Sequence, residues 1–229
     1  RSYARRVEGE DRKETWPETV VRVVDGNLGL VDPRFIEDGE REKLIKLLLP
    51  FDALPAGRHL SASGVKGRQF LFNCHAAGWD YADPAAHFTF MFDQLMQGGG
   101  VGSNYSNRYL EQMPPIKEAP LVHLFCAEWH PDIEGFRSFL ASPGTIAAAL
   151  GESHVWHQVE DSREGWVEAE KVLLDAAWEE SETGYRKTII FDVSLVRRKG
   201  AVLVSSGGKA AGPGPLVELL SGSAAVLTS

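Results

Sequence analysis

Apolar residues recur at helical spacing near the start of the chain and predict two helices there. The first begins after Thr15, because Thr15 and Glu18 have the spacing of a capping box, and Gly26 with Asn27 ends it. Its apolar face consists of Val20, Val21, Val23 and Val24. The second helix covers residues 40–49. It is expected to bury Leu44, Ile45, Leu47 and Leu48.

The pattern then changes to a short strand, an apolar helix and a glycine-rich turn. Residues 70–74 are apolar and aromatic, and they predict a buried strand that ends at Cys74. Residues 98–104 form the turn. The helix between them is marked by Phe88, Met91, Phe92, Leu95 and Met96. This order brings the cysteine close to the turn, so the region reads as a site.

Strands and helices alternate in the rest of the chain. The expected elements are a strand at 121–127, a short helix capped by Asp132 that runs through Leu140, a loop at 142–151, an amphipathic helix after a capping pair of Asp161 and Glu164, a strand at 188–193, a glycine-rich turn at 207–215 and the start of a helix at 216–220. Strands separated by helices favour an α/β sheet or barrel with parallel strands.

Composition and charge restrict the class of protein. The chain has 229 residues, 43% of them hydrophobic, which is enough for a substantial core. Its net charge of −8 argues against binding to nucleic acid. No apolar run is long enough to cross a membrane, and no secretory signal is present, so a cytoplasmic location is expected. Both ends lack the pattern of a finished domain, which suggests a fragment.

Two features could carry chemistry, and each also has a simpler explanation. The turn at 98–104 could cradle a phosphate with backbone N–H groups or could simply end a helix; the spacing favours neither. Cys74 and Cys126 are too few for a disulfide framework. An isolated cysteine such as Cys74 is more often a small buried apolar residue than a reactive thiol.

Metal binding and acid–base chemistry are weaker possibilities. Nitrogen and sulfur ligands for zinc could come from His123, Cys126, His130, His154 and His157. However, His123 and Cys126 point to opposite faces of a strand, so structural roles are favoured. The carboxylates Glu160, Asp161 and Glu164 are better explained by helix capping than by catalysis.

Several blocks in a fixed order carry a family resemblance. They are residues 12–20, 68–74, 98–108, 159–166 and 191–194, the last leading to 207–215. In this order the chain resembles the adenosylcobalamin-dependent, class II ribonucleotide reductases, most closely the monomeric ribonucleoside-triphosphate reductases. The resemblance extends to about Leu220.

The resemblance implies an α/β fold in which N-terminal helices at 1–50 precede the first part of a ten-stranded α/β barrel at 51–220. The barrel is incomplete in this chain, and the tail at 221–229 does not follow the family. The implied reaction is the reduction of ribonucleotides, with the triphosphates as the implied substrates, to deoxyribonucleotides by a radical mechanism that adenosylcobalamin initiates.

The resemblance also implies roles for particular residues. Cys74 matches the first cysteine of the redox pair that supplies reducing electrons and ends in a disulfide. The candidate substrate-binding residues are Ser61, Asn73, Gly102, Ser103, Asn104 and Ser106. No metal-ligating residues are expected. The implied partners are a ribonucleotide substrate, a deoxynucleotide effector, a thioredoxin-like reductant and the missing C-terminal portion.

Departures from the family pattern leave a second hypothesis open. The chain contains neither the second redox cysteine nor the finger-loop cysteine, and Arg198 and Ala211 stand where the family usually has Pro and Ser. The chain could therefore be the front part of a working reductase. Alternatively, it is an inactive nucleotide-binding or structural remnant. Zinc analysis would test the weaker metal-binding reading.

Overall fold

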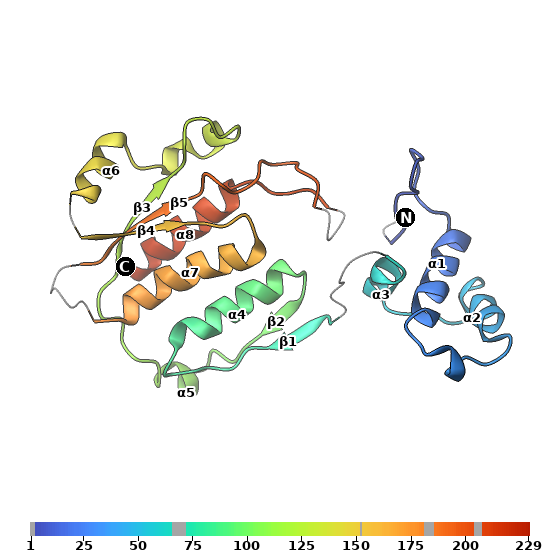
Figure 1. Cartoon of the computed structure of the whole chain (residues 1–229). Helices are drawn as coiled ribbons and strands as arrows, with labels where there is room; N and C mark the ends of the chain where they lie inside the picture. The colour runs from blue at the N-terminus through green and yellow to red at the C-terminus, as the bar shows by residue number, and fades with distance from the viewer. Residues whose placement is uncertain (1–2, 66–71, 152, 181–185, 204–207) are drawn as a thin grey trace. The chain divides into compact units, whose positions relative to one another are not determined.

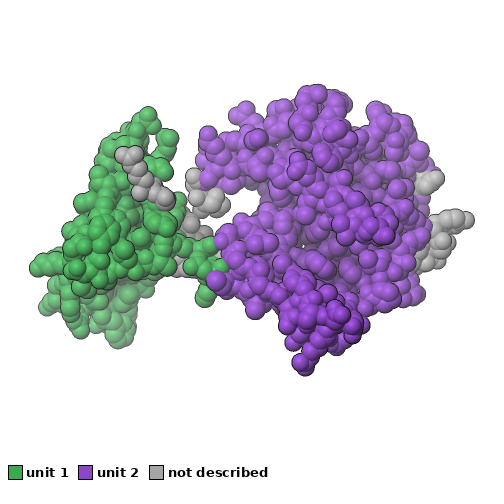
Figure 2. Space-filling view, turned by 180° about the vertical axis from the view of Figure 1, so that it is seen from behind, with its two compact units in different colours: residues 1–73 green, residues 74–229 purple. Residues whose placement is uncertain are grey.

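The computed structural model describes residues 3–65, 72–151, 153–180, 186–203 and 208–229. The chain divides into two compact units, residues 1–73 and 74–229, which Figure 2 colours separately. The boundary predicted from the sequence lies after residue 50 instead. The structure differs because the third helix of the chain packs against the first one, within unit 1.

Unit 1 is built around helix α1 (Trp16–Leu28). The predicted capping box of Thr15 and Glu18 is present, and Val20, Val23 and Val24 are buried as expected. The sequence predicts that the helix ends at Gly26, and this prediction is wrong. Gly26 lies inside α1 against the backbone of Gly64, where a larger side chain would have no room.

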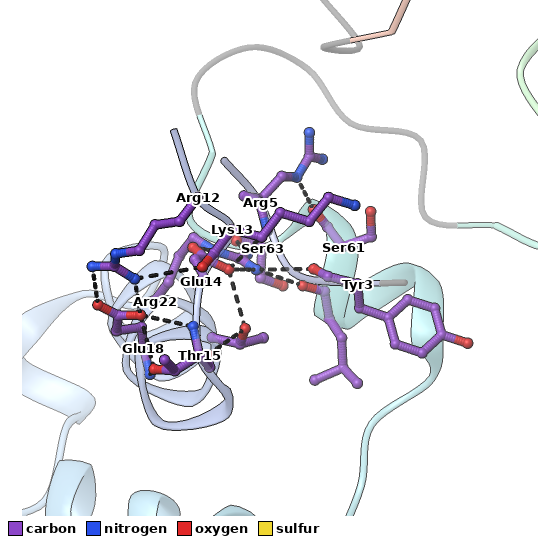
Figure 3. A network of polar contacts seen from close by, with 12 residues as sticks. Tyr3, Arg5, Arg12, Lys13, Glu14, Thr15, Glu18, Arg22, Ser61 and Ser63 are labelled. Atoms are coloured by element: carbon purple, nitrogen blue, oxygen red, sulfur yellow. Dashed lines mark hydrogen bonds and ion pairs between the residues drawn. The ribbon is translucent and has the colours of Figure 1, made fainter. Parts of the chain in front are cut away.

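A polar network joins α1 to the N-terminal segment and to helix α3 (Gly57–Ala62) (Figure 3). Arg22 Nε donates to Glu14 Oε1 at 2.6 Å, and the two side chains are 13% and 11% exposed. Arg22 also donates to the carbonyl oxygens of Leu60, at 3.0 Å, and Ser63. Glu14 Oε2 accepts from the backbone N–H of Arg5 at 3.0 Å. Three segments of unit 1 therefore share one largely buried ion pair.

The short helix α2 (Glu40–Leu48) corrects a prediction about burial. None of its residues is fully buried, and Leu47 is 43% exposed. Within unit 1 the helix packs mainly on α1, so one neighbour covers only part of its broad apolar face. A short 3₁₀ turn (Pro33–Phe35) precedes it.

Unit 2 begins with a parallel strand pair. Strand β1 (Cys74–Ala76) is followed by helix α4 (Pro84–Met96) and strand β2 (Gly100–Gly102), with Cys74 opposite Gly100. Part of the predicted glycine-rich turn is thus a strand. Residues 70 and 71 of the strand predicted at 70–74 lie outside the described residues. Residues 72 and 73 are described but belong to no strand, and β1 starts at Cys74 rather than ending there. A single turn of helix, α5 (Asn107–Leu110), comes after β2.

A second parallel sheet contains β3 (Leu121–Phe125), β4 (His154–Gln158) and β5 (Thr188–Asp192), in the order β3-β5-β4. The crossovers contain α6 (Pro143–Leu150) and α7 (Arg163–Trp178), and α8 (Gly214–Leu227) follows. The sequence analysis expected a loop in place of α6. Strand β4 was not predicted, since only two of its five residues, Val155 and Trp156, are apolar, and both are exposed.

Two predicted caps are wrong. Ser162 caps α7 by accepting from the N–H of Gly165 at 2.9 Å, and Asp161 instead binds Arg197. The short helix expected after Asp132 consists of two 3₁₀ turns (Ile133–Gly135 and Arg137–Phe139). Asp132 does not cap it but accepts from the N–H of Lys199 at 2.5 Å. In both cases the carboxylate accepts hydrogen bonds from a residue that is distant in the sequence.

Helices cover both faces of the second sheet, and all five residues of β5 are buried. Ile189 and Phe191 pack in the core formed with α7 and α8, while Ile190 faces the other way onto α6. Helix α7 also packs beside α4, and this contact joins the regions of the two sheets (Figure 1). The predicted α/β fold class with parallel strands is confirmed.

Helix α8 continues beyond Leu220 through most of the tail that the sequence analysis set apart. Leu216, Val217 and Leu220 are buried on it. Among the described residues, no helix combines the length and apolarity needed to span a membrane.

Candidate functional site

The β1–β2 pair presents an exposed face beside Cys74 that is poor in side chains. Because residues of a strand point alternately to its two faces, Cys74 and Ala76 share a face with their partners Gly100 and Gly102. All four are exposed, whereas His75 and Val101 on the opposite face are half-buried. A ligand on the exposed face would meet backbone, one methyl group and the Cys74 thiol.

The glycines of this region have separate causes. Gly98 has a φ of +78° and ends α4, which is a conformation that glycine adopts without strain. Gly99 is buried, and a Cβ there would lie 3.1 Å from the His75 ring. Around Gly102, by contrast, a Cβ would meet nothing within 4 Å. The backbone conformation explains Gly98 and packing explains Gly99, but neither explains Gly102.

The polar residues predicted to bind substrate follow β2 directly. Ser103 Oγ donates to the carbonyl oxygen of Ala77 at 3.0 Å, so its hydroxyl holds the segment after β1. Asn104 Oδ1 accepts from the N–H of Ser106 at 2.9 Å. The Ser106 side chain makes no capping bond to α5. The structure therefore brings Gly102, Ser103, Asn104 and Ser106 together at one end of the pair.

Cys74 lies at the opposite end of the short pair from these residues. Two residues along a strand separate its position from that of Gly102, which is roughly 7 Å. A nucleotide is long enough to contact both ends. The remaining two candidates belong to unit 1: Asn73 directly precedes Cys74 and is exposed, and Ser61 lies in α3, where its carbonyl oxygen accepts from Arg5 Nε at 2.7 Å.

An aromatic cluster behind this region was not predicted from the sequence. Trp79, His87 and Tyr105 come from the segment after β1, from α4 and from the segment after β2. The rings of Trp79 and His87 stack at 3.6 Å, and Tyr105 meets both rings edge-on. The sequence contains one signal of this cluster, the polar ring of His87 within the largely apolar α4.

The carboxyl edge of the second sheet carries a buried polar group. Asp192 Oδ1 accepts from the N–H and the hydroxyl of Ser194, at 2.9 and 2.5 Å. Ser194 Oγ accepts from the N–H of Ala127 at 2.8 Å. Cys126 is 5% exposed here, and burial, with a smaller effect of Asp192, raises the pKa of its thiol to about 11. The hydrogen bonds of Ser194 tie strand ends together, while burial disfavours the reactive thiolate form of Cys126.

Two histidines near this sheet have contacts within the chain. His130 Nε2 lies 2.8 Å from the carbonyl oxygen of Val196, and His157 packs against Phe191. Burial lowers the pKa of His157. Across the described ranges, no three His, Cys, Asp or Glu residues are grouped so that they could hold a metal ion. The contacts of His130 and His157 within the chain account for their positions.

Two regions of the chain match models of known protein families. Residues 145–227 match the model described as "B12-dependent ribonucleotide reductase, insertion domain", and residues 1–65 match "Ribonucleotide reductase alpha domain". The first match includes most of the tail that was expected to depart from the family.

A solved structure supports the same relationship. The crystal structure of a B-12 dependent (class II) ribonucleotide reductase superimposes with a TM-score of 0.81 and 28% identity, over 99% of this chain and 36% of that one. The chain belongs to the B12-dependent, class II ribonucleotide reductase family. The fold expected from the resemblance, part of the family's α/β architecture, is confirmed.

Two curated relatives show how much of a reductase the chain represents. It is 47% identical over 96% of its length to a putative adenosylcobalamin-dependent ribonucleoside-triphosphate reductase of Mycobacterium phage D29, of which it covers 31%. It is 30% identical over 96% of its length to the adenosylcobalamin-dependent ribonucleoside-triphosphate reductase of Lactobacillus leichmannii, of which it covers 34%. The chain thus spans about a third of these relatives.

Proposed function

We propose that this chain is part of an enzyme that reduces ribonucleoside triphosphates to deoxyribonucleotides, with Cys74 as a redox thiol beside the substrate. The observation that supports this most strongly is the exposed face of the β1–β2 pair. It combines an accessible thiol with two glycines, and the similarity to ribonucleoside-triphosphate reductases suggests the reaction. Glycines at such positions let a ligand approach the backbone closely.

In the proposed reaction the substrate loses its 2′-hydroxyl group as water and gains a hydrogen in its place. Two cysteine thiols give up two electrons and two protons and become a disulfide. Cys74 is one of these thiols. Cys126 is a poor partner because it is buried and its pKa is raised, so the second cysteine would come from outside these 229 residues. A thioredoxin-like protein would then reduce the disulfide.

Substrate contacts are proposed for the residues around this face. Gly102 offers open backbone, and Asn104 and Ser106 offer an amide and a hydroxyl group at the exposed end of β2. Ser103 supports them through its bond to Ala77. Ser61 and Asn73 remain proposed contacts from unit 1. A deoxynucleotide effector is a further proposed partner.

Adenosylcobalamin is the proposed cofactor of the complete enzyme, where it supplies the radical. The described residues do not by themselves fit it. They contain no group of metal ligands, and the strand pair beside Cys74 has only three residues in each strand. No residue of this chain is therefore assigned to the cofactor.

A chimeric enzyme tests the proposal. The aligned segment of the phage D29 relative is replaced by this chain, and deoxyribonucleotide formation is measured with adenosylcobalamin and a thioredoxin-type reductant, with the parent protein as positive control. We expect turnover in the chimera, loss of repeated turnover in Cys74→Ser and retention in the matched Cys126→Ser variant. Full turnover in Cys74→Ser would contradict the redox role. Nucleotide binding without any turnover would favour the inactive remnant.

A further inference from the structure

His87 is a buried polar residue on an otherwise apolar helix, and both of its ring nitrogens have partners. The residue is 2% exposed in the first half of α4. Its Nδ1 lies 2.7 Å from the carbonyl oxygen of Gly78, and its Nε2 lies 3.3 Å from the hydroxyl of Tyr105. Gly78 follows β1, and Tyr105 follows β2. One side chain therefore connects the segments that leave the two strands.

The hydrogen-bond partners of His87 determine which ring nitrogen acts as a donor. A carbonyl oxygen can only accept a hydrogen bond, so Nδ1 carries the proton. His87 Nε2 faces the Tyr105 hydroxyl, whose single proton can be donated to only one acceptor at a time. Tyr105 Oη also lies 3.0 Å from Met91 Sδ on the next turn of α4. The orientation of the Tyr105 ring is consequently fixed from α4 at two points.

Trp79 strengthens the same connection. Its ring stacks on His87 with an angle of 9° between the planes, and its Nε1 donates to the carbonyl oxygen of Asn104 at 2.8 Å. The His87 ring thus holds Trp79, and Trp79 holds Asn104. Two routes, through Tyr105 and through Trp79, lead from His87 to the segment that carries the proposed substrate contacts.

We propose that His87 is a positioning residue, which fixes residues 102–106 relative to β1 and thereby prepares the proposed nucleotide contacts. The inference rests on the proposed function of this face. It does not give His87 a catalytic role, because its ring is buried and both nitrogens are engaged within the chain. Preorganised contacts bind a ligand more tightly than contacts that must first be ordered.

Three variants of the whole chain separate the contacts. His87→Leu removes both hydrogen bonds and the aromatic stack. His87→Asn keeps a donor that can reach Gly78, and Tyr105→Phe removes only the hydroxyl. The matched control is Thr89→Val, because Thr89 is buried on the same helix and its hydroxyl bonds only to the helix carbonyls of Ala85 and Ala86.

Two readouts test the inference separately from the proposed function. Amide hydrogen exchange of residues 102–106 should be about tenfold faster in His87→Leu, intermediate in His87→Asn and Tyr105→Phe, and unchanged in Thr89→Val. Exchange of β5 should be unchanged in all four variants, which excludes general destabilisation. CTP binding, measured by calorimetry, should weaken in the same order, by about tenfold in His87→Leu.

The outcomes are distinguishable. If exchange at 102–106 is the same in His87→Leu and in the unmodified chain, the positioning role is wrong, whatever happens to binding. If exchange rises but CTP binding does not weaken, His87 orders the segment without preparing a nucleotide site, which also overturns the inference. If the unmodified chain shows no CTP binding, the proposed function is contradicted, while the exchange data still decide whether His87 fixes the segment.

Discussion

Each of the two parallel sheets of unit 2 carries a cysteine. Cys74 begins β1, and Cys126 directly follows β3. The β1–β2 pair has three residues per strand and an exposed face, whereas the second sheet lies between helices and its central strand is completely buried. The same strand–helix–strand pattern thus produces an accessible thiol in one place and an inert one in the other.

The difference shows what burial contributes in each region. The second sheet supplies stability, since its core includes the fully buried Ile189 and Phe191. The β1–β2 pair is supported from one side by α4 and by the ring contacts of Trp79, His87 and Tyr105. A surface that must admit a ligand cannot also be filled by the chain's own side chains.

The largest expected effect contrasts core substitutions in the two sheets. Phe191→Ala in β5 should lower the free energy of unfolding by about 3–5 kcal/mol, because it opens a cavity in a fully packed core. Val101→Ala in β2 should lower it by about 1 kcal/mol or less, since Val101 is only half-buried. Denaturant titration of unit 2 measures both. Equal losses would show that the two sheets contribute alike.

The next effect concerns thiol reactivity. At pH 8 a thiol with a pKa of about 11 is ionised in roughly one molecule per thousand, so Cys126 should react very slowly with iodoacetamide. Cys74 is exposed and should react about a hundredfold faster or more. Mass spectrometry of peptides taken over time gives both rates, and single Cys→Ser variants assign them. Comparable rates at the two positions would remove the contrast on which the redox assignment depends.

The smallest effect concerns α7, the helix that packs against both α4 and α8. Glu170 on α7 is 7% exposed; the Ser223 hydroxyl donates to its Oε1 at 2.8 Å, and none of the described residues donates to its Oε2. Burial raises the pKa of Glu170 above its ordinary value of 4.5. The folded state therefore binds this proton more tightly than the unfolded state does.

Stability from this group is present below pH 4.5 and is lost as the pH rises from there through the raised pKa. Glu170→Gln should remove that loss and stabilise the chain at pH 7 by roughly 1 kcal/mol, because a neutral amide replaces a buried charge. Thermal unfolding of both forms from pH 4 to pH 8 tests this. A variant that is less stable than the parent at pH 7 would contradict the expected sign.

Local patterns in the sequence were sufficient for elements that depend on local contacts. The capping box of Thr15 and Glu18, helix α4 and the buried strand β5 all follow from spacing and composition within one element. Residues whose partner is distant were mispredicted. Asp161 pairs with Arg197 rather than capping α7, and α2 lacks neighbours that would bury its apolar side.

The candidate site was predictable in part. The order of elements in the sequence predicts that Cys74 lies close to the glycine-rich segment. It also predicts a turn there, where the structure has strand β2. Its pairing with β1 depends on register, which no local pattern specifies. The roles of Trp79, His87 and Tyr105 could not be predicted, because their contacts join three segments that are separated in sequence. Family resemblance, rather than spacing, supplied the redox role of Cys74.

The central claim is that a ribonucleotide binds on the exposed face beside Cys74, and protection of the thiol tests it most directly. The rates of iodoacetamide modification of Cys74 and Cys126 are measured with and without saturating CTP. The account predicts that CTP slows modification of Cys74 severalfold and leaves Cys126 unchanged. If CTP binds to the chain and Cys74 reacts at the same rate as before, the nucleotide lies elsewhere and the assignment of this face is wrong.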